Sequence, residues 1–175
     1  MKYRRHLEGR TDYKLRLGLL KSKKPRLVIR KSLKHLLAQI VQYDPNGDKV
    51  ITTAKTTELK KNYGWNRASR NIPSGYLLGL LIASKSLKSG IKEAILDMGL
   101  HPKSKGSVIF AVLRGAIEGG LKIPHDKEVL PSDQRIKGEH IKNDKVKNKY
   151  TKSSQDKITT DFELVKQKLL QGIKK

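Results

Sequence analysis

Arginine and lysine side chains crowd the first 35 residues, and the chemistry they offer is the binding of phosphate. This segment holds thirteen Lys and Arg against two acidic residues, in a chain of 175 residues whose net charge is +23. Such an excess destabilises a compact protein unless a polyanion neutralises it. Each phosphate that meets a Lys or Arg releases a counterion, so nucleic acid is the expected partner, with an anionic membrane as the competing possibility.

The concentration of charge predicts an N-terminal basic arm over residues 1–25. Gly9 and Gly18 interrupt the segment, and Pro25 precedes the first predicted strand. One interpretation is a solvated, disordered tail. The other is an arm that lies on RNA and becomes ordered only when bound.

No group of residues suggests catalysis or a metal site. The chain has no Cys, and its five His are scattered without an i,i+4 pair. The segment 44–48 resembles the start of a calcium loop, but Lys49 and Lys55 occupy the positions where that loop needs Gly and Glu. A serine-nucleophile elbow and a Gly-rich phosphate loop are both absent. We therefore expect a protein that is not an enzyme and has no cofactor and no metal.

One loop, residues 101–107, could bind a second phosphate. Lys103 and Lys105 precede Gly106 at the start of a predicted helix. Free backbone N–H groups and the helix dipole favour an anion at such a place. An ordinary solvated loop explains the same residues equally well, so both interpretations remain open.

The hydropathy pattern argues against a membrane protein. The longest apolar stretch, residues 76–83, is far shorter than the twenty or so residues of a membrane-spanning helix. The N-terminus leads into no apolar segment typical of a secretory signal. We expect an intracellular protein.

Three strands in succession are predicted after the arm. Residues 26–30 and 50–56 are rich in β-branched side chains, and residues 36–43 have the pattern of a strand between them. A basic connection at 31–35 and a turn at 44–48, where Pro fixes φ and Asn-Gly tolerates the left-handed region, join the strands into a meander.

The pattern becomes helical in the middle of the chain. Residues 58–71 before it are polar and predict an irregular segment. Residues 74–89 are apolar nearly all round, so this helix must pack against a sheet. A short buried strand at 92–98 would then be reached by a crossover. Residues 106–118 form a second helix with one apolar face. The order β-β-β-α-β-α predicts an α/β fold in which helices pack on a single mixed sheet.

The chain is expected to divide into the arm, a core over residues 26–141 and a polar extension over 142–175. The extension carries a short amphipathic helix at 161–171, with Phe162, Val165 and Leu169 on one face. A helix of this length is marginal alone. We expect it to dock on RNA or on a neighbouring protein.

Motifs spread along residues 4–141 resemble large-subunit ribosomal protein eighteen, in the archaeal and eukaryotic branch of that family. The motifs follow in one order: Gly9-Arg10-Thr11-Asp12-Tyr13, Arg26-Leu27-Val28-Ile29-Arg30-Lys31-Ser32, Tyr63-Gly64-Trp65, Asn71-Ile72-Pro73, Gly99-Leu100-His101, Lys105-Gly106-Ser107, and Arg135-Ile136-Lys137-Gly138-Glu139-His140-Ile141. Beyond Ile141 the match is weak. So many matches in one order are very unusual by chance.

The resemblance implies a structural component of the large ribosomal subunit in the cytoplasm, which binds 5S rRNA and attaches it to 23S rRNA in the central protuberance. Neighbouring ribosomal proteins, including others associated with 5S rRNA, would be further partners, with no membrane involved. A general RNA-binding or chaperone protein without 5S specificity is the alternative. The RNA-binding residues carried over from the family are Arg4, Arg5, Arg10, Tyr13, Arg16, Arg26, Arg30, Lys31, Ser32, Lys34, His35, Lys103 and Lys105.

Overall fold

The fold is built on one mixed sheet of four strands. In this computed structural model, which describes residues 3–142 and 158–174, the strands are β1 (Arg26–Lys31), β2 (Leu36–Gln42), β3 (Lys49–Lys55) and β4 (Ile95–Asp97). Their order is β3-β2-β1-β4, with the meander antiparallel and β4 parallel to β1. The predicted α/β class, mixed sheet and crossover are confirmed.

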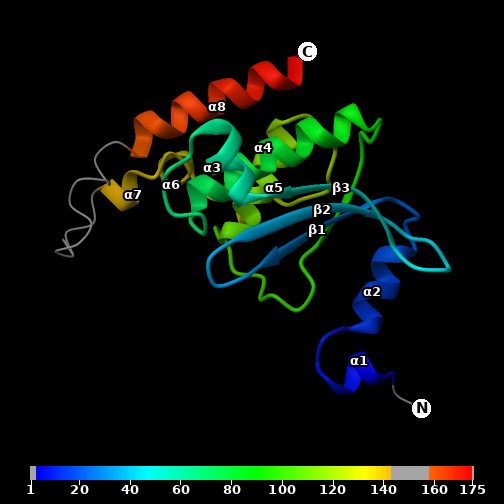
Figure 1. The fold of residues 1–175 in the computed structure, drawn as a ribbon. Coiled ribbons are helices and arrows are strands. Elements are labelled where there is room, and N and C mark those ends of the chain that lie inside the picture. Colours follow the sequence, from blue (N-terminus) through cyan, green and yellow to red (C-terminus); the bar gives the residue numbers. More distant parts are fainter. Residues whose placement is uncertain (1–2, 143–157, 175) are drawn as a thin grey trace.

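Two helices cover one face of the sheet and form the centre of the core (Figure 1). Helix α4 (Ile72–Lys88) begins where Asn71 Oδ1 accepts the Ser74 N–H at 2.9 Å and Ser74 Oγ accepts the Asn71 N–H at 3.1 Å. This reciprocal capping satisfies two N–H groups that a helix start leaves without partners. Helix α5 (Val108–Glu118) crosses α4 closely, and Gly79 and Gly115 lie at the crossing, where an added Cβ would meet the backbone of the other helix.

Residues 58–71, expected to be irregular, contain part of a helix that the sequence interpretation missed. Helix α3 (Thr56–Tyr63) begins where the Glu58 carboxylate accepts the Lys55 N–H at 3.0 Å, and it ends at Gly64 in the left-handed conformation. Its Leu59 is fully buried, and Trp65 after it is also fully buried in the core. Shorter elements follow α5: η1 (Lys127–Val129), α6 (Asp133–Lys137) and α7 (Glu139–Lys142).

The C-terminal helix α8 (Ile158–Lys174) packs on the chain's own α4, which corrects the expectation that it docks on RNA or on another protein. The apolar face expected from the sequence is the face that packs, since Phe162, Val165 and Leu169 are each at most 3% exposed. Lys166 Nζ lies 5.1 Å from the centre of the Tyr76 ring, and the Phe162 ring lies 5.5 Å from that ring. Helix α8 is therefore part of the core.

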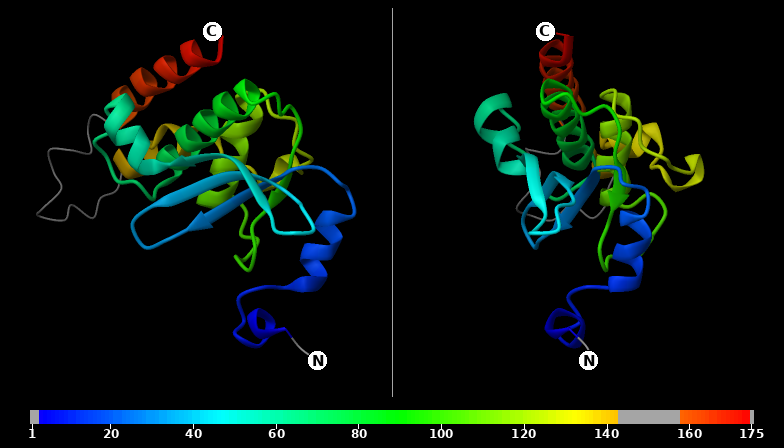
Figure 2. Two further views of the ribbon diagram at one scale, coloured as in Figure 1. Left: turned by 45° about the vertical axis from the view of Figure 1, so that its right-hand side comes forward. Right: turned by 90° about the vertical axis from the view of Figure 1, so that its right-hand side faces the viewer.

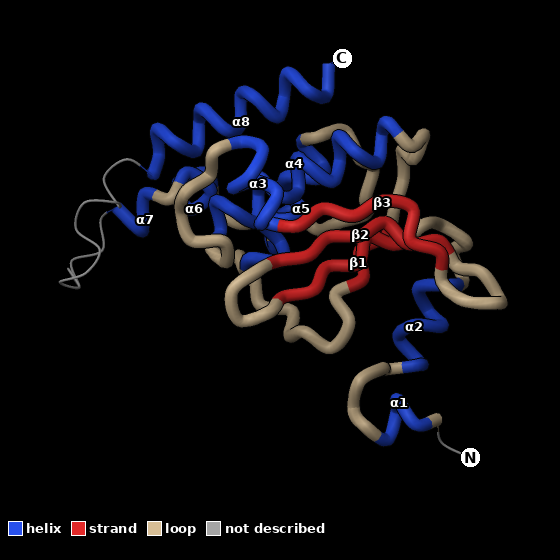
Figure 3. Tube along the Cα trace, in the orientation of Figure 1, coloured by secondary structure: helices blue, strands red, loops and turns tan. Residues whose placement is uncertain are grey.

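The predicted arm extends from the side of the sheet opposite the packed helices, as the three views show (Figures 1 and 2). It contains two short helices, α1 (Arg4–Leu7) and α2 (Tyr13–Leu20), and the Asp12 carboxylate caps α2 by accepting the Leu15 N–H at 3.0 Å. In Figure 3 the strands lie between these two groups of helices. One sheet face is thus buried, and the other faces the arm.

Candidate nucleic-acid interface

The sheet face turned away from α4 and α5 carries a mixture of apolar, polar and basic side chains. In the antiparallel register Val28 pairs with Gln39, and Gln39 pairs with Thr53, so these three share that face. Arg30 lies two residues beyond Val28 on the same side, and its side chain is about half exposed. An antiparallel sheet with one face packed on a core commonly leaves the other face open.

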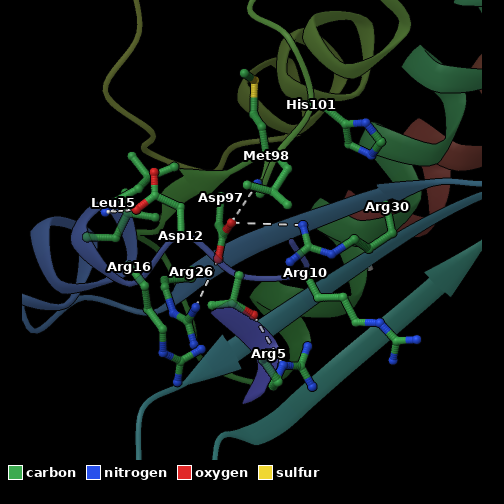
Figure 4. Close-up of a pocket in the computed structure, with 14 residues that line it drawn as sticks. Arg5, Arg10, Asp12, Leu15, Arg16, Arg26, Arg30, Asp97, Met98 and His101 are labelled. Atoms are coloured by element: carbon green, nitrogen blue, oxygen red, sulfur yellow. Dashed lines mark hydrogen bonds and ion pairs between the residues drawn. The ribbon is translucent and has the colours of Figure 1, made fainter. Parts of the chain in front are cut away.

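Arm and sheet together form an arginine-lined pocket at one end of this face (Figure 4). Its volume is about 310 Å³, and Arg5, Arg10 and Arg16 from the arm face Arg26 and Arg30 from β1 across it. His101, from the loop after β4, completes the wall. Residues far apart in the sequence are therefore brought to one strongly basic surface.

Two carboxylates hold the inner arginines of this pocket. Arg26 is only 3% exposed at its side chain, and it donates to Asp97 at 2.9 Å and to Asp48 at 2.6 Å. Asp48 also accepts two hydrogen bonds from Arg16 of α2, both at 2.9 Å. Burial raises the pKa of Asp48, but hydrogen bonds and charge from Arg26 and Arg16 outweigh that effect and hold the pKa below its ordinary value. The carboxylate therefore stays ionised and ties the arm to the sheet.

Arg26 thus stands apart from the other arginines expected to meet RNA. Its guanidinium is buried and has carboxylate partners on two sides. A buried charge needs such partners, because an unpaired one destabilises a fold by about 3–5 kcal/mol. The placement of Arg26 fits a residue that shapes the pocket.

The outer arginines leave more of their surface available. Arg4 and Arg10 share Glu8, at 2.8 and 3.2 Å, with their side chains 91% and 71% exposed. Arg5 donates to Thr11 Oγ1 at 3.1 Å. Arg30 lies against Gly99, where a Cβ would come within 2.9 Å of Arg30 Nη1. Exposed pairs of this kind contribute little stability, so phosphate can replace them readily.

Tyr13 and the hairpin between β1 and β2 add further groups to this side. The Tyr13 ring lies 5.0 Å from the Tyr3 ring. Ser32 Oγ accepts the His35 N–H at 2.9 Å and donates to the His35 carbonyl at 2.8 Å, which closes the hairpin. Lys31, Lys34 and His35 are exposed there. Ser32 therefore fixes the turn that presents its basic neighbours.

Lys103 and Lys105 lie outside the arm pocket, on the exposed loop before α5. Lys105 pairs with Glu128 at 2.8 Å, and both side chains are about 70% exposed. The structure therefore groups the arm arginines with β1 and places these two lysines outside that group, although Lys103 lines another hollow together with Leu15 and Leu19 of α2.

Neither the two carboxylates that bind Arg26 nor His101 was among the site residues expected from the sequence. Asp48 was considered only as part of a calcium loop, and it is brought to the arm by the fold, 32 positions away from Arg16. Burial, followed by the charges of Lys31 and Arg30, lowers the pKa of His101, so its ring is neutral at pH 7. The described residues contain no group of three or more His, Cys, Asp or Glu placed to hold a metal ion. None of the helices in the described part of the chain is long and apolar enough to cross a membrane.

The family model described as "Ribosomal large subunit proteins 60S L5, and 50S L18" matches residues 1–92 and 88–126. The matched region contains the arm, all four strands and both central helices. This is a family of structural ribosomal proteins and not of enzymes. With most of its length matched, the chain belongs to this family of large-subunit ribosomal proteins.

Proposed function

We propose that this chain binds 5S rRNA and attaches it to 23S rRNA in the central protuberance of the cytoplasmic large subunit. The observation that carries the proposal is the convergence of arm and sheet arginines on one pocket beside an open sheet face. A folded RNA presents phosphates at fixed positions, and a pre-arranged set of guanidinium groups selects for that shape.

Each part of the surface has its own role in the proposal. Arg4, Arg5, Arg10, Arg16 and Arg30 meet phosphates, and Tyr13 contacts a base or ribose. Lys31, Lys34 and His35 extend the contact along the hairpin, which Ser32 holds in shape, while Arg26 positions its neighbours through Asp48 and Asp97. Lys103 and Lys105 provide a contact outside the arginine-lined pocket. The 23S rRNA and neighbouring ribosomal proteins, including others that associate with 5S rRNA, are the remaining partners.

The test compares the affinity of the full chain for 5S rRNA with its affinity for an unrelated structured RNA of the same length, over a series of salt concentrations. We expect tighter binding to 5S rRNA, with the preference retained at moderate salt where nonspecific phosphate contacts weaken. Replacing Arg5, Arg10 and Arg30 by Gln should reduce the salt slope by about one for each phosphate that is no longer neutralised. Equal affinity for both RNAs would refute 5S specificity and favour a general RNA-binding or chaperone protein.

A further inference from the structure

A second basic pocket lies beyond His101, on the side away from the arm. Its volume is about 430 Å³, and its cationic wall comes from Lys31 at the end of β1, Arg70 before α4 and Arg135 on α6. Three segments that are distant in the sequence therefore each contribute one cationic side chain to this pocket.

The cations of this pocket are not neutralised within the described part of the chain. None of the described residues that line the pocket is Asp or Glu. Arg70 donates from Nη1 to the Leu33 carbonyl at 3.2 Å, a contact that leaves its charge uncompensated. Elsewhere comparable cations have carboxylate partners: Arg114 pairs with Glu118, and Lys85 pairs with Glu58. Like charges held together without a counter-charge favour the binding of an anion.

The guanidinium of Arg135 lies close to a glycine in the wall of the pocket. Gly106 has a positive φ of 65°, and a Cβ there would come within 3.0 Å of Arg135 Nη1. In the arm pocket, Arg30 lies against Gly99 in the same way. In addition, the Ser107 hydroxyl oxygen, on a residue that lines the second pocket, is buried without a hydrogen-bond partner in the structure. An unsatisfied buried hydroxyl is unfavourable, so a ligand oxygen here would remove that penalty.

We infer that this pocket, formed by Lys31, Arg70 and Arg135, binds a backbone phosphate of the RNA that occupies the arm pocket. The inference rests on the proposed function, and it adds Arg70 and Arg135 to the interface. His101 lines both pockets, so a polyanion lying along this edge passes from one to the other. Burial is the main cause of the lowered pKa of His101, and the charges of Lys31 and Arg30 lower it further. RNA is favoured over an acidic peptide because of this continuity with the arm pocket.

The first test replaces Arg70 and Arg135 together by Gln in the full chain and measures 5S rRNA affinity across a salt series. We expect the salt slope to fall by about 2 if each guanidinium meets a phosphate. The matched control replaces Lys88 and Lys122 together by Gln. Both side chains are exposed and line neither basic pocket, so the salt slope should stay nearly unchanged. Equal reductions in the two variants would show only a general effect of charge and would overturn the inference.

A conservative variant separates charge from folding. Arg70→Lys with Arg135→Lys keeps both charges, so most of the slope should return while the thermal unfolding midpoint stays at the wild-type value. If the Lys variant reduces the slope as much as the Gln variant with its stability unchanged, phosphate neutralisation is not the role of the pocket.

A cross-linking experiment identifies the occupant in the assembled large subunit. A photoreactive residue in place of Ser104, which lines the pocket, should cross-link to rRNA. Cross-links to protein alone would indicate that an acidic protein segment, and not an RNA phosphate, occupies the pocket, and they would overturn the inference. Failure of the proposed function would look different, since the wild-type chain would then show no preference for 5S rRNA.

Discussion

At the scale of single residues, Asp48 connects three parts of the molecule. It lies in the turn between β2 and β3, and it accepts hydrogen bonds from Arg16 of the arm and from Arg26 of β1. Arg26 in turn reaches Asp97 at the end of β4. The Asp48 carboxylate therefore helps to fix the position of the arm relative to the sheet, together with the ion pair between Lys24 of the arm and Glu93.

We predict that Asp48→Asn destabilises the fold by about 2 kcal/mol, because it weakens charged hydrogen bonds to Arg26 and Arg16. Amide hydrogen exchange should become faster in α2 and stay unchanged in α4. Because the folded-state pKa of Asp48 is lowered, its stabilising contribution is present above the unfolded-state pKa and disappears as the pH falls through the folded-state value. The stability difference between wild type and variant should therefore shrink below about pH 4.

The control for this experiment is Asp44→Asn in the same turn. Asp44 Oδ1 accepts the Asn46 N–H at 3.0 Å, a role that an amide oxygen also fills. The control removes the same charge and should leave stability and exchange in α2 near the wild-type values. Equal effects from both substitutions would mean that net charge, and not the hydrogen bonds of Asp48, holds the arm.

Sequence patterns predicted basic residues for the candidate site but not the carboxylates that bind them. The charge of the first 35 residues is visible in composition, and the family resemblance adds the hairpin and the loop before α5. Arg26 and Asp97 are 71 positions apart, and Arg16 and Asp48 are 32 apart, so no local pattern joins them. The burial of Arg26 follows from tertiary packing alone, as does the grouping of Arg70 with Arg135.

At the scale of elements, the close crossing of α4 and α5 depends on glycine. A Cβ at Gly79 would meet the Val112 carbonyl oxygen and the backbone of Gly115, and neither is the movable end of a side chain. We predict that Gly79→Ala destabilises the protein by about 3 kcal/mol, since overpacking a core typically destabilises by about 1–3 kcal/mol and backbone atoms yield least. Denaturant unfolding measures the change.

Gly172→Ala in α8 is the matched control, because nothing lies within 4 Å of a Cβ at that position. Replacing an unhindered helical Gly by Ala stabilises a helix by up to about 1 kcal/mol. We therefore expect Gly79→Ala to lower the free energy of unfolding and Gly172→Ala to raise it. A neutral Gly79→Ala would show that the helices can move apart at no cost in stability.

Predictions of elements succeeded where hydrophobic periodicity was strong. The strands of the meander and helices α4 and α5 have clear patterns, and their bounds agree with the sequence to within a few residues. Helix α3 was missed because its residues are mostly polar, although Glu58 near its start and Gly64 after its end are ordinary helix signals. The apolar face of α8 was identified correctly, but an apolar face in the sequence does not indicate which element packs against it. In the structure that element is α4.

At the scale of the whole molecule, the apolar core and the arm pocket lie on opposite sides of the sheet. Helices α4, α5 and α8 bury the apolar core on one side (Figure 1). The arm pocket lies toward the other side, and the second pocket lies at the edge where β1 meets the loop before α5. The exposed arginines of the two pockets, Arg5, Arg10, Arg70 and Arg135, can therefore be replaced without removing a side chain from the core.

This arrangement predicts that the two pockets contribute independently to one RNA complex. The Gln variants of Arg5 with Arg10, and of Arg70 with Arg135, share no carboxylate partner among the described residues. When combined, their reductions in binding free energy should therefore add to within about 0.5 kcal/mol. The measurement is a double-mutant cycle on 5S rRNA affinity at fixed salt. If the combined variant binds no more weakly than the worse single variant, the pockets serve alternative binding modes, and one RNA does not occupy both.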